Sequence, residues 1–189
     1  LYTQQEVQLD NMKKRSYPIV WHSRKNRFVT LASPEMPELR FQEQRNAEMA
    51  LVFTEEPYGR YVTTEGTPHK DLYAVDLKTG DKKLIVKDLR GNPRISPEAG
   101  YIIWWSDPDT ALFAWNARRS EIVRLTDNRL APFYDEENDV PDFPDAHGLA
   151  GWLGGDEAMI VYDKYDLWKM DPNGKKNPER LTKGRETQT

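Results

Sequence analysis

Short apolar runs alternate with polar turns along most of this 189-residue chain, and three segments share one pattern. Each has a leucine, an aromatic residue, an apolar residue and an Asp or Asn, followed by a turn and a second apolar stretch. Side chains that alternate with period two point to opposite faces of a strand, so each segment is predicted to form a β-hairpin. The three segments are residues 71–86, 111–126 and 166–182.

The residues at the predicted turns support this interpretation. Gly80 and Gly174 tolerate the positive φ that tight hairpin turns require. The Asp or Asn that precedes each turn is expected to accept hydrogen bonds from backbone amides of that turn.

A second pattern precedes each hairpin: a large apolar residue, a polar turn and a short apolar strand. It occurs at residues 21–30, 95–104 and 152–161. Together with the hairpin it makes four short antiparallel strands, which is the blade of a β-propeller. We therefore predict an all-β fold, a partial β-propeller of about three to four antiparallel four-stranded blades, in a single propeller fragment over residues 1–189.

The spacing places the blade units at about residues 17–88, 89–127 and 148–183. The first unit is the longest, because it contains an apparent insertion over roughly residues 33–66.

Three elements are predicted inside that insertion. Residues 49–53 and 60–63 are apolar enough to form extra strands. Pro37 suits the first position of a helix, so residues 37–45 are an alternative short helix.

Charge is distributed unevenly along the chain. It carries 27 Lys and Arg against 31 Asp and Glu, for a net charge of −4, yet no Lys or Arg lies between Arg129 and Lys164. Nine acids lie in that interval, so the rest of the chain has a net charge of +5. Three prolines there disfavour a regular helix or a central strand. We therefore expect a long exposed acidic loop over residues 131–148.

The acidic loop contains the candidate binding residues Asp135, Glu136 and Glu137. Three interpretations stay open: a solvated loop, a contact with substrate or another domain, and a Ca²⁺ site. Paired carboxylates can hold an ammonium group, and their oxygens are ligands for calcium. The stretch lacks the spacing of a known calcium loop, and the solvated loop is the default.

Histidines and tryptophans give no further site. His22, His69 and His147 show no metal-binding spacing. Tryptophans in predicted strands are expected to pack between blades rather than to form a ligand platform. They are Trp104, Trp105, Trp115, Trp152 and Trp168. We expect no catalytic residue, no metal and no cofactor.

Composition excludes several classes of protein. The absence of cysteine excludes a disulfide scaffold and a Cys nucleophile. The acidic net charge argues against a general nucleic-acid or anionic-membrane surface. No apolar run approaches the length of a membrane span.

The blade motifs resemble those of a known family. They are similar to motifs in the β-propeller domains of the prolyl oligopeptidase and dipeptidyl peptidase IV family. The wider resemblance is to TolB-type propellers. The motifs are Ile95-Ser96-Pro97-Glu98 and the hairpins at residues 71–80 and 166–174. Residues 162–168 look most like those of bacterial dipeptidyl-peptidase-like serine peptidases. Glu98-Ala99-Gly100 departs from the Asp-Gly that is usual in the family at this turn.

The resemblance implies that this chain is a non-catalytic piece of a longer serine peptidase. In that family the propeller caps a C-terminal α/β-hydrolase domain, which carries a serine in a Gly-x-Ser-x-Gly turn; none of the six serines here lies in such a turn. The propeller would gate access and help bind peptide, so the implied partners are the parent's own C-terminal domain and a peptide substrate. A periplasmic or secreted location is also implied.

Two other functions remain open: a TolB-type binding or scaffold propeller with no enzyme attached, and a propeller glycosidase with paired carboxylates. An incomplete ring also leaves strand edges unprotected. We therefore expect self-association through open blade edges, or lower stability than that of a closed ring.

Overall fold

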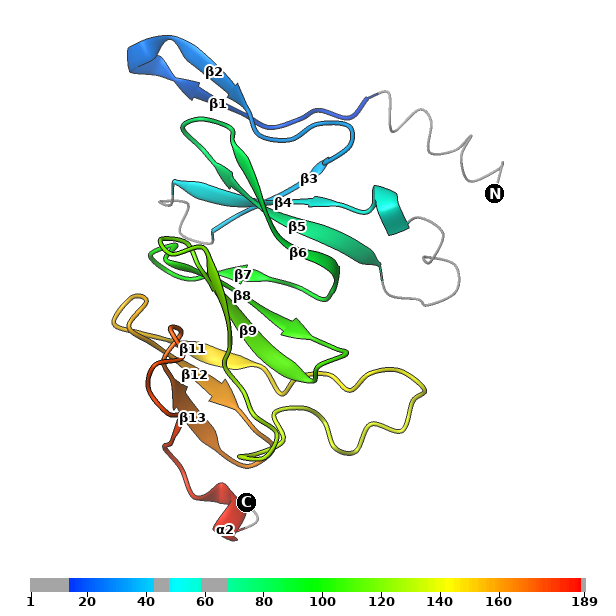
Figure 1. Ribbon diagram of the computed structural model, residues 1–189, viewed down its shortest axis with the longest axis vertical. Helices are drawn as coiled ribbons and strands as arrows, with labels where there is room; N and C mark the ends of the chain where they lie inside the picture. The colour runs from blue at the N-terminus through cyan, green and yellow to red at the C-terminus, as the bar shows by residue number, and fades with distance from the viewer. Residues whose placement is uncertain (1–13, 43–47, 59–67, 188–189) are drawn as a thin grey trace.

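The computed structural model describes residues 14–42, 48–58 and 68–187, and it is nearly all β (Figure 1). Three four-stranded antiparallel sheets follow one another along the chain, and within each sheet every strand pairs with its neighbours in sequence. We call these sheets the first, second and third blades. The first blade comprises β3 (Glu38–Phe41), β4 (Met49–Thr54), β5 (His69–Asp76) and β6 (Lys82–Arg90).

The other two blades have the same topology. The second blade comprises β7 (Arg94–Ile95), β8 (Tyr101–Ser106), β9 (Ala111–Asn116) and β10 (Glu121–Arg124). The third blade comprises β11 (Leu149–Leu153), β12 (Ala158–Tyr162), β13 (Leu167–Met170) and β14 (Glu179–Arg180).

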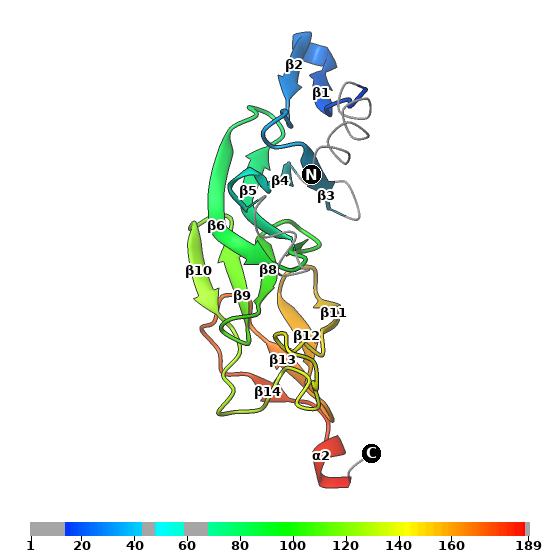
Figure 2. The same cartoon turned by 90° about the vertical axis from the view of Figure 1, so that its right-hand side faces the viewer.

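A two-stranded hairpin precedes the blades, and a short helix follows them. The hairpin comprises β1 (Ile19–His22), the 3-10 turn η1 (Ser23–Lys25) and β2 (Arg27–Thr30), and a second 3-10 turn, η2 (Glu56–Tyr58), follows β4. Figure 2 shows the blades stacked along the long axis, with the hairpin at one end and α2 (Gly184–Thr187) at the other.

Both faces of the middle blade are buried, because a neighbouring blade covers each of them. Along β8, Ile102 and Trp104 pack against the first blade, whereas Tyr101 and Ile103 pack against the third. All four side chains are at most 8% exposed. A strand buried on both faces is apolar at every position, which explains the uninterrupted apolar run of β8. The predicted all-β partial propeller is thereby confirmed.

The first blade begins later than the sequence pattern predicts. Within the described residues β1 and β2 pair only with each other, so the first sheet runs from residue 38 to residue 90 rather than from about residue 17. The other two sheets, at residues 94–124 and 149–180, lie within their predicted units of 89–127 and 148–183.

The apparent insertion supplies two strands of the first blade. The predicted strand at residues 49–53 is present as β4. The helix predicted from Pro37 is wrong over residues 38–41, which form β3 and pair with β4. Pairing with the next strand, β4, outweighs the local helix-start signal of a proline. The strand predicted at residues 60–63 lies outside the described residues.

The hairpin turns contain the side-chain to backbone hydrogen bonds that the sequence predicts. The Asp76 carboxylate accepts hydrogen bonds from two backbone amides of its turn, at 2.7 and 2.9 Å. The side chains of Asn116 and Asp171 make equivalent bonds in the next two hairpins. Gly80 and Gly174 have positive φ, at 81° and 64°.

Asp156, in the turn between β11 and β12, links the third blade to the second. Its carboxylate accepts hydrogen bonds from Ser96 Oγ at 2.7 Å, Glu98 N at 2.9 Å and Gly100 N at 2.7 Å. From the first blade, Gln42 Nε2 donates to the Ser96 carbonyl at 2.9 Å. The turn before β8 is therefore held from both sides by polar contacts with neighbouring blades.

Replacing Asp156 with alanine should lower the free energy of unfolding by about 3 kcal/mol, because three donors lose a charged acceptor and one of them, Ser96, is fully buried. Urea denaturation of Asp156→Ala measures this loss. Glu157→Ala, an exposed change in the same turn, is the matched control. Equal stability of the two variants would contradict the role assigned to Asp156.

The predicted acidic loop is exposed only in its middle. Phe133 is 1% exposed and lies edge-to-face on Trp168, with ring centroids 5.7 Å apart. Tyr134 pairs with Ala146 in an isolated β-bridge. The predicted exposed loop of residues 131–148 is therefore confined to residues 135–145, since its ends supply apolar surface and backbone pairing to the fold.

Phe133→Ala should destabilise the protein by about 3–5 kcal/mol, because it opens a cavity between the second and third blades. Val140→Ala, in the exposed middle of the same segment, should change stability by less than about 0.5 kcal/mol. Thermal or urea unfolding of the two variants compares them directly. A small effect of Phe133→Ala would mean that the segment does not anchor the fold.

Two buried aspartates connect the end of the chain to the third blade. Asp166 accepts a hydrogen bond from Thr182 Oγ1 at 2.7 Å. Asp163 accepts from Trp168 Nε1 at 3.0 Å and from the Arg185 guanidinium at 3.1 Å. Burial raises the pKa of both carboxyl groups, but the donors around them outweigh it, and each pKa lies below its ordinary value.

A depressed carboxyl pKa stabilises the fold above the unfolded-state pKa of about 3.9, and this contribution is lost as the pH falls through the folded-state pKa. Asp166→Asn should therefore lower the free energy of unfolding at pH 7, because the charged acceptor is lost. The difference from the unmodified chain should shrink below about pH 4. Urea unfolding at pH 7, 5 and 3 tests this, with the exposed Asp139→Asn as control. A penalty that is constant with pH would refute the assignment.

Candidate functional site

The first strands of the three blades lie along one groove. β3, β7 and β11 are each the edge strand of their sheet within the described residues. Residues from all three strands and their flanks line a cavity of about 510 Å³. An edge strand leaves backbone N–H and C=O groups unpaired along one side. The groove therefore combines backbone hydrogen-bonding groups with side chains from three blades.

The side chains that line this groove include two arginines and, within the described residues, no carboxylate. Arg40, in β3, lies over the Phe53 ring at 5.4 Å and is 3.4 Å from a Glu38 oxygen. Arg94, in β7, is exposed, and none of the ion pairs between described residues includes it. The groove is therefore electropositive although the chain as a whole is acidic.

Gln42 places a polar atom at the wall of the groove. Its side chain is only 4% exposed, and its Nε2 donates to the carbonyls of Ser96 and Pro97. This orientation leaves Oε1 as the free end of the amide, and among the described residues that oxygen has no donor. Gln42 therefore forms part of the groove wall, and its buried amide is bonded to the turn before β8.

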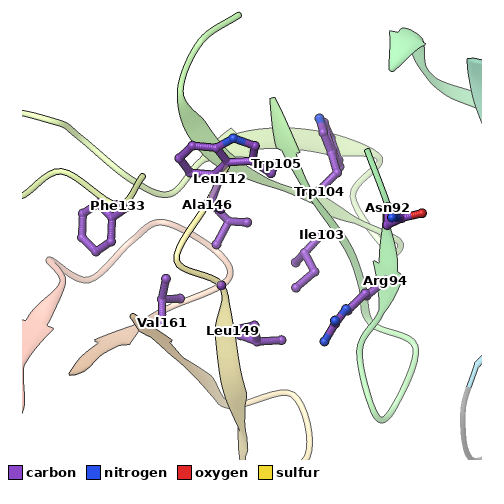
Figure 3. A pocket seen from close by; sticks show the side chains of 11 residues that line it. Asn92, Arg94, Ile103, Trp104, Trp105, Leu112, Phe133, Ala146, Leu149 and Val161 are labelled. Atoms are coloured by element: carbon purple, nitrogen blue, oxygen red, sulfur yellow. The ribbon is translucent and has the colours of Figure 1, made fainter. Parts of the chain in front are cut away.

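A smaller apolar pocket adjoins the groove between the second and third blades (Figure 3). Its volume is about 120 Å³, and its apolar wall includes Ile103, Leu112, Phe133 and Val161.

The groove and the apolar pocket share three lining residues, Asn92, Arg94 and Leu149. In Figure 3 the Arg94 side chain extends from β7 toward Leu149 at the start of β11. The arginine therefore lies at the junction of the groove and the pocket.

The candidate residues of the acidic loop lie elsewhere. Asp135, Glu136 and Glu137 are all exposed, and none of them lines the groove or the apolar pocket. The Asp135 carboxylate accepts the Glu137 amide at 3.0 Å, and Glu137 forms an ion pair with Lys164 at 2.5 Å. A role for these three residues in binding stays a prediction.

The three histidines are separate from one another. His22 Nε2 is 3.1 Å from the Leu77 carbonyl, and His69 Nδ1 is 2.5 Å from Asp88 Oδ1. His147 Nε2 is buried with no hydrogen-bond partner in the described residues. In the same part of the chain no three His, Asp or Glu side chains form a group that could hold a metal ion.

The tryptophans divide into two groups. Trp104, Trp115 and Trp168 are buried between blades, as predicted. Trp105 and Trp152 are only half-buried; Trp105 lines the apolar pocket and Trp152 lines the groove. The sequence pattern alone does not separate the two groups, because both lie in strands.

Sequence reasoning missed the groove arginines. Arg94 directly precedes the Ile95-Ser96-Pro97 motif, and this position marks it as part of the first strand of a blade. Arg40 lies in the segment that the sequence predicts to be helical, so the sequence pattern does not identify it as a residue of a first strand.

Three stacked four-stranded antiparallel sheets with their first strands along one groove define a partial β-propeller. No known family profile matches this chain, and no curated protein matches it. Among solved structures it is similar to the crystal structure of TolB from Acinetobacter baumannii, with 15% sequence identity and a TM-score of 0.43. The similarity covers 89% of this chain and 38% of that one, so the chain spans well under half of the TolB structure.

The assignment to a partial propeller depends on the sheets themselves. None of the comparisons points to the dipeptidyl peptidase IV or prolyl oligopeptidase family, so that finer assignment stays a proposal. No helix in the described residues is long and apolar enough to cross a membrane.

Proposed function

We propose that this chain is a non-catalytic binding region of a β-propeller, and that its groove holds an extended peptide. The observation that carries the proposal is the convergence of three edge strands, two arginines and no carboxylate in one cavity within the described residues.

An extended peptide matches the chemistry of this groove. Its backbone can pair with the open edge of a strand, as in β-strand addition. The two arginines suit a carboxylate or a backbone carbonyl of the peptide. A folded domain would not reach these groups as readily, because they lie inside a cavity.

In the whole protein, we propose that this region belongs to a dipeptidyl-peptidase-like serine peptidase. It would restrict access to a C-terminal α/β-hydrolase domain and help bind peptide for it. The support is the blade motif at residues 95–98 and the hairpin motifs at residues 71–80 and 166–174. A periplasmic or secreted location and self-association through open blade edges belong to the same proposal.

Side-chain contacts support a binding role rather than a catalytic one. Ser96 Oγ donates to Asp156, and Ser106 Oγ donates to Asp109, so these two hydroxyls are bound to carboxylates within turns. A glycosidase needs a pair of carboxyl groups at its site. The described lining of the groove offers none, so the groove does not support that alternative.

A TolB-type scaffold propeller is the second candidate, and one observation favours it. Trp21 and Phe28 are cross-strand partners in the β1–β2 hairpin, and their rings stack with centroids 6.1 Å apart. They are 58% and 62% exposed. Exposed aromatic surface of this kind is typical of contacts with another protein.

Calorimetric titration with an unstructured, acetylated hexapeptide tests the peptide groove. Binding should weaken by about tenfold or more in the double variant Arg40→Gln/Arg94→Gln, because two cations leave the groove. Arg24→Gln, in the exposed hairpin, is the matched control and should bind like the unmodified chain. Binding that survives the double variant but is lost in Trp21→Ala would instead favour the scaffold candidate.

A further inference from the structure

We propose that the junction of the groove and the apolar pocket binds the carboxyl terminus of a peptide whose last residue is apolar. This inference depends on the proposed peptide binding, and it adds the chemistry of the bound end. The terminal carboxylate would contact Arg94, and the terminal side chain would enter the apolar pocket.

Arg94 is suited to a carboxylate by charge and by position. It is exposed, it has no ion pair within the described residues, and it lies where the groove and the pocket share their walls. A guanidinium can form two parallel hydrogen bonds to one carboxylate, which gives direction as well as attraction.

The apolar pocket has the size and lining of a side-chain site. Its volume of about 120 Å³ is close to that of an engineered cavity of about 150 Å³ that binds benzene. Ile103, Leu112, Phe133 and Val161 give it an aliphatic and aromatic wall. A leucine or phenylalanine side chain suits this volume, whereas a charged side chain would lose its hydration there.

A peptide terminus satisfies both features at once. The terminal carboxylate and the terminal side chain are attached to the same Cα, so they can occupy neighbouring sites. In the middle of an extended peptide, adjacent side chains point to opposite faces. An internal acidic residue and its apolar neighbour would therefore not meet Arg94 and the pocket together.

The test compares two pentapeptides, acetyl-Gly-Ser-Gly-Ser-Leu with a free carboxylate and the same peptide with a terminal amide. Titration calorimetry should show the free acid binding about tenfold more tightly than the amide. Exchange of the terminal leucine for glycine should weaken binding by a similar factor. Quenching or enhancement of tryptophan fluorescence gives a second readout, because Trp105 lines the pocket.

Two arginine variants localise the effect. Arg94→Gln should remove the preference for the acid over the amide. Arg40→Gln is the matched control, because Arg40 lines the groove but not the apolar pocket, and it should keep the preference whatever its effect on affinity. Both side chains are at least partly exposed, so neither change removes a buried group.

The outcomes separate this inference from the proposed function. If acid and amide bind equally, or if Arg94→Gln keeps the preference, the carboxyl-terminal site is refuted while peptide binding stands. If neither peptide binds the unmodified chain, both proposals are refuted.

Discussion

Burial of both faces of a blade is the constraint on which the rest of the structure depends. A four-stranded sheet with apolar side chains on both faces is stable only when a neighbour covers each face, because exposed apolar area costs about 25 cal/mol per Å². The second blade satisfies this condition, with Ile102 and Trp104 against the first blade and Tyr101 and Ile103 against the third. The Asp156 carboxylate and the Gln42 amide add polar contacts at the turn before β8. Apolar stacking thus brings the blades together, and these bonds set their alignment at one end.

The groove is a consequence of this stacking. Blades that share one topology and stack face to face bring their first strands to one side, and those strands have no partner beyond them in the described residues. Arg40 and Arg94 hold corresponding places on neighbouring first strands and so line the same cavity. The apolar pocket has a different origin, because Phe133 from the acidic segment and Val161 from the third blade help to close it. The candidate binding surface therefore depends on both the repeat and the segment that interrupts it.

The acidic segment also contacts the blades electrostatically. Arg90 in β6 donates to Asp142 at 3.2 Å and lies over the Phe143 ring, while Lys164 beside the third blade pairs with Glu137. The acidic segment, which has no Lys or Arg of its own, is thus paired with basic side chains of the first and third blades. Exposed pairs of this kind contribute little singly, so the buried Phe133 is the stronger anchor.

The sequence by itself determined the repeated blade, since the hairpins, their Asx-type turns and the buried tryptophans all follow from local alternation and turn chemistry. It did not determine where the first blade starts, because Pro37 favours a helix at residues 38–41, and only pairing with β4 identifies β3 as the first strand. Only the tertiary structure revealed the groove, since Arg40, Gln42 and Arg94 meet through blade stacking and not through spacing. The acidic run was a candidate site in the sequence, and it contains Asp135, Glu136 and Glu137. These residues are exposed but lie outside the cavity. An acidic run indicates that a segment is exposed, and it does not indicate which surface the segment lies on.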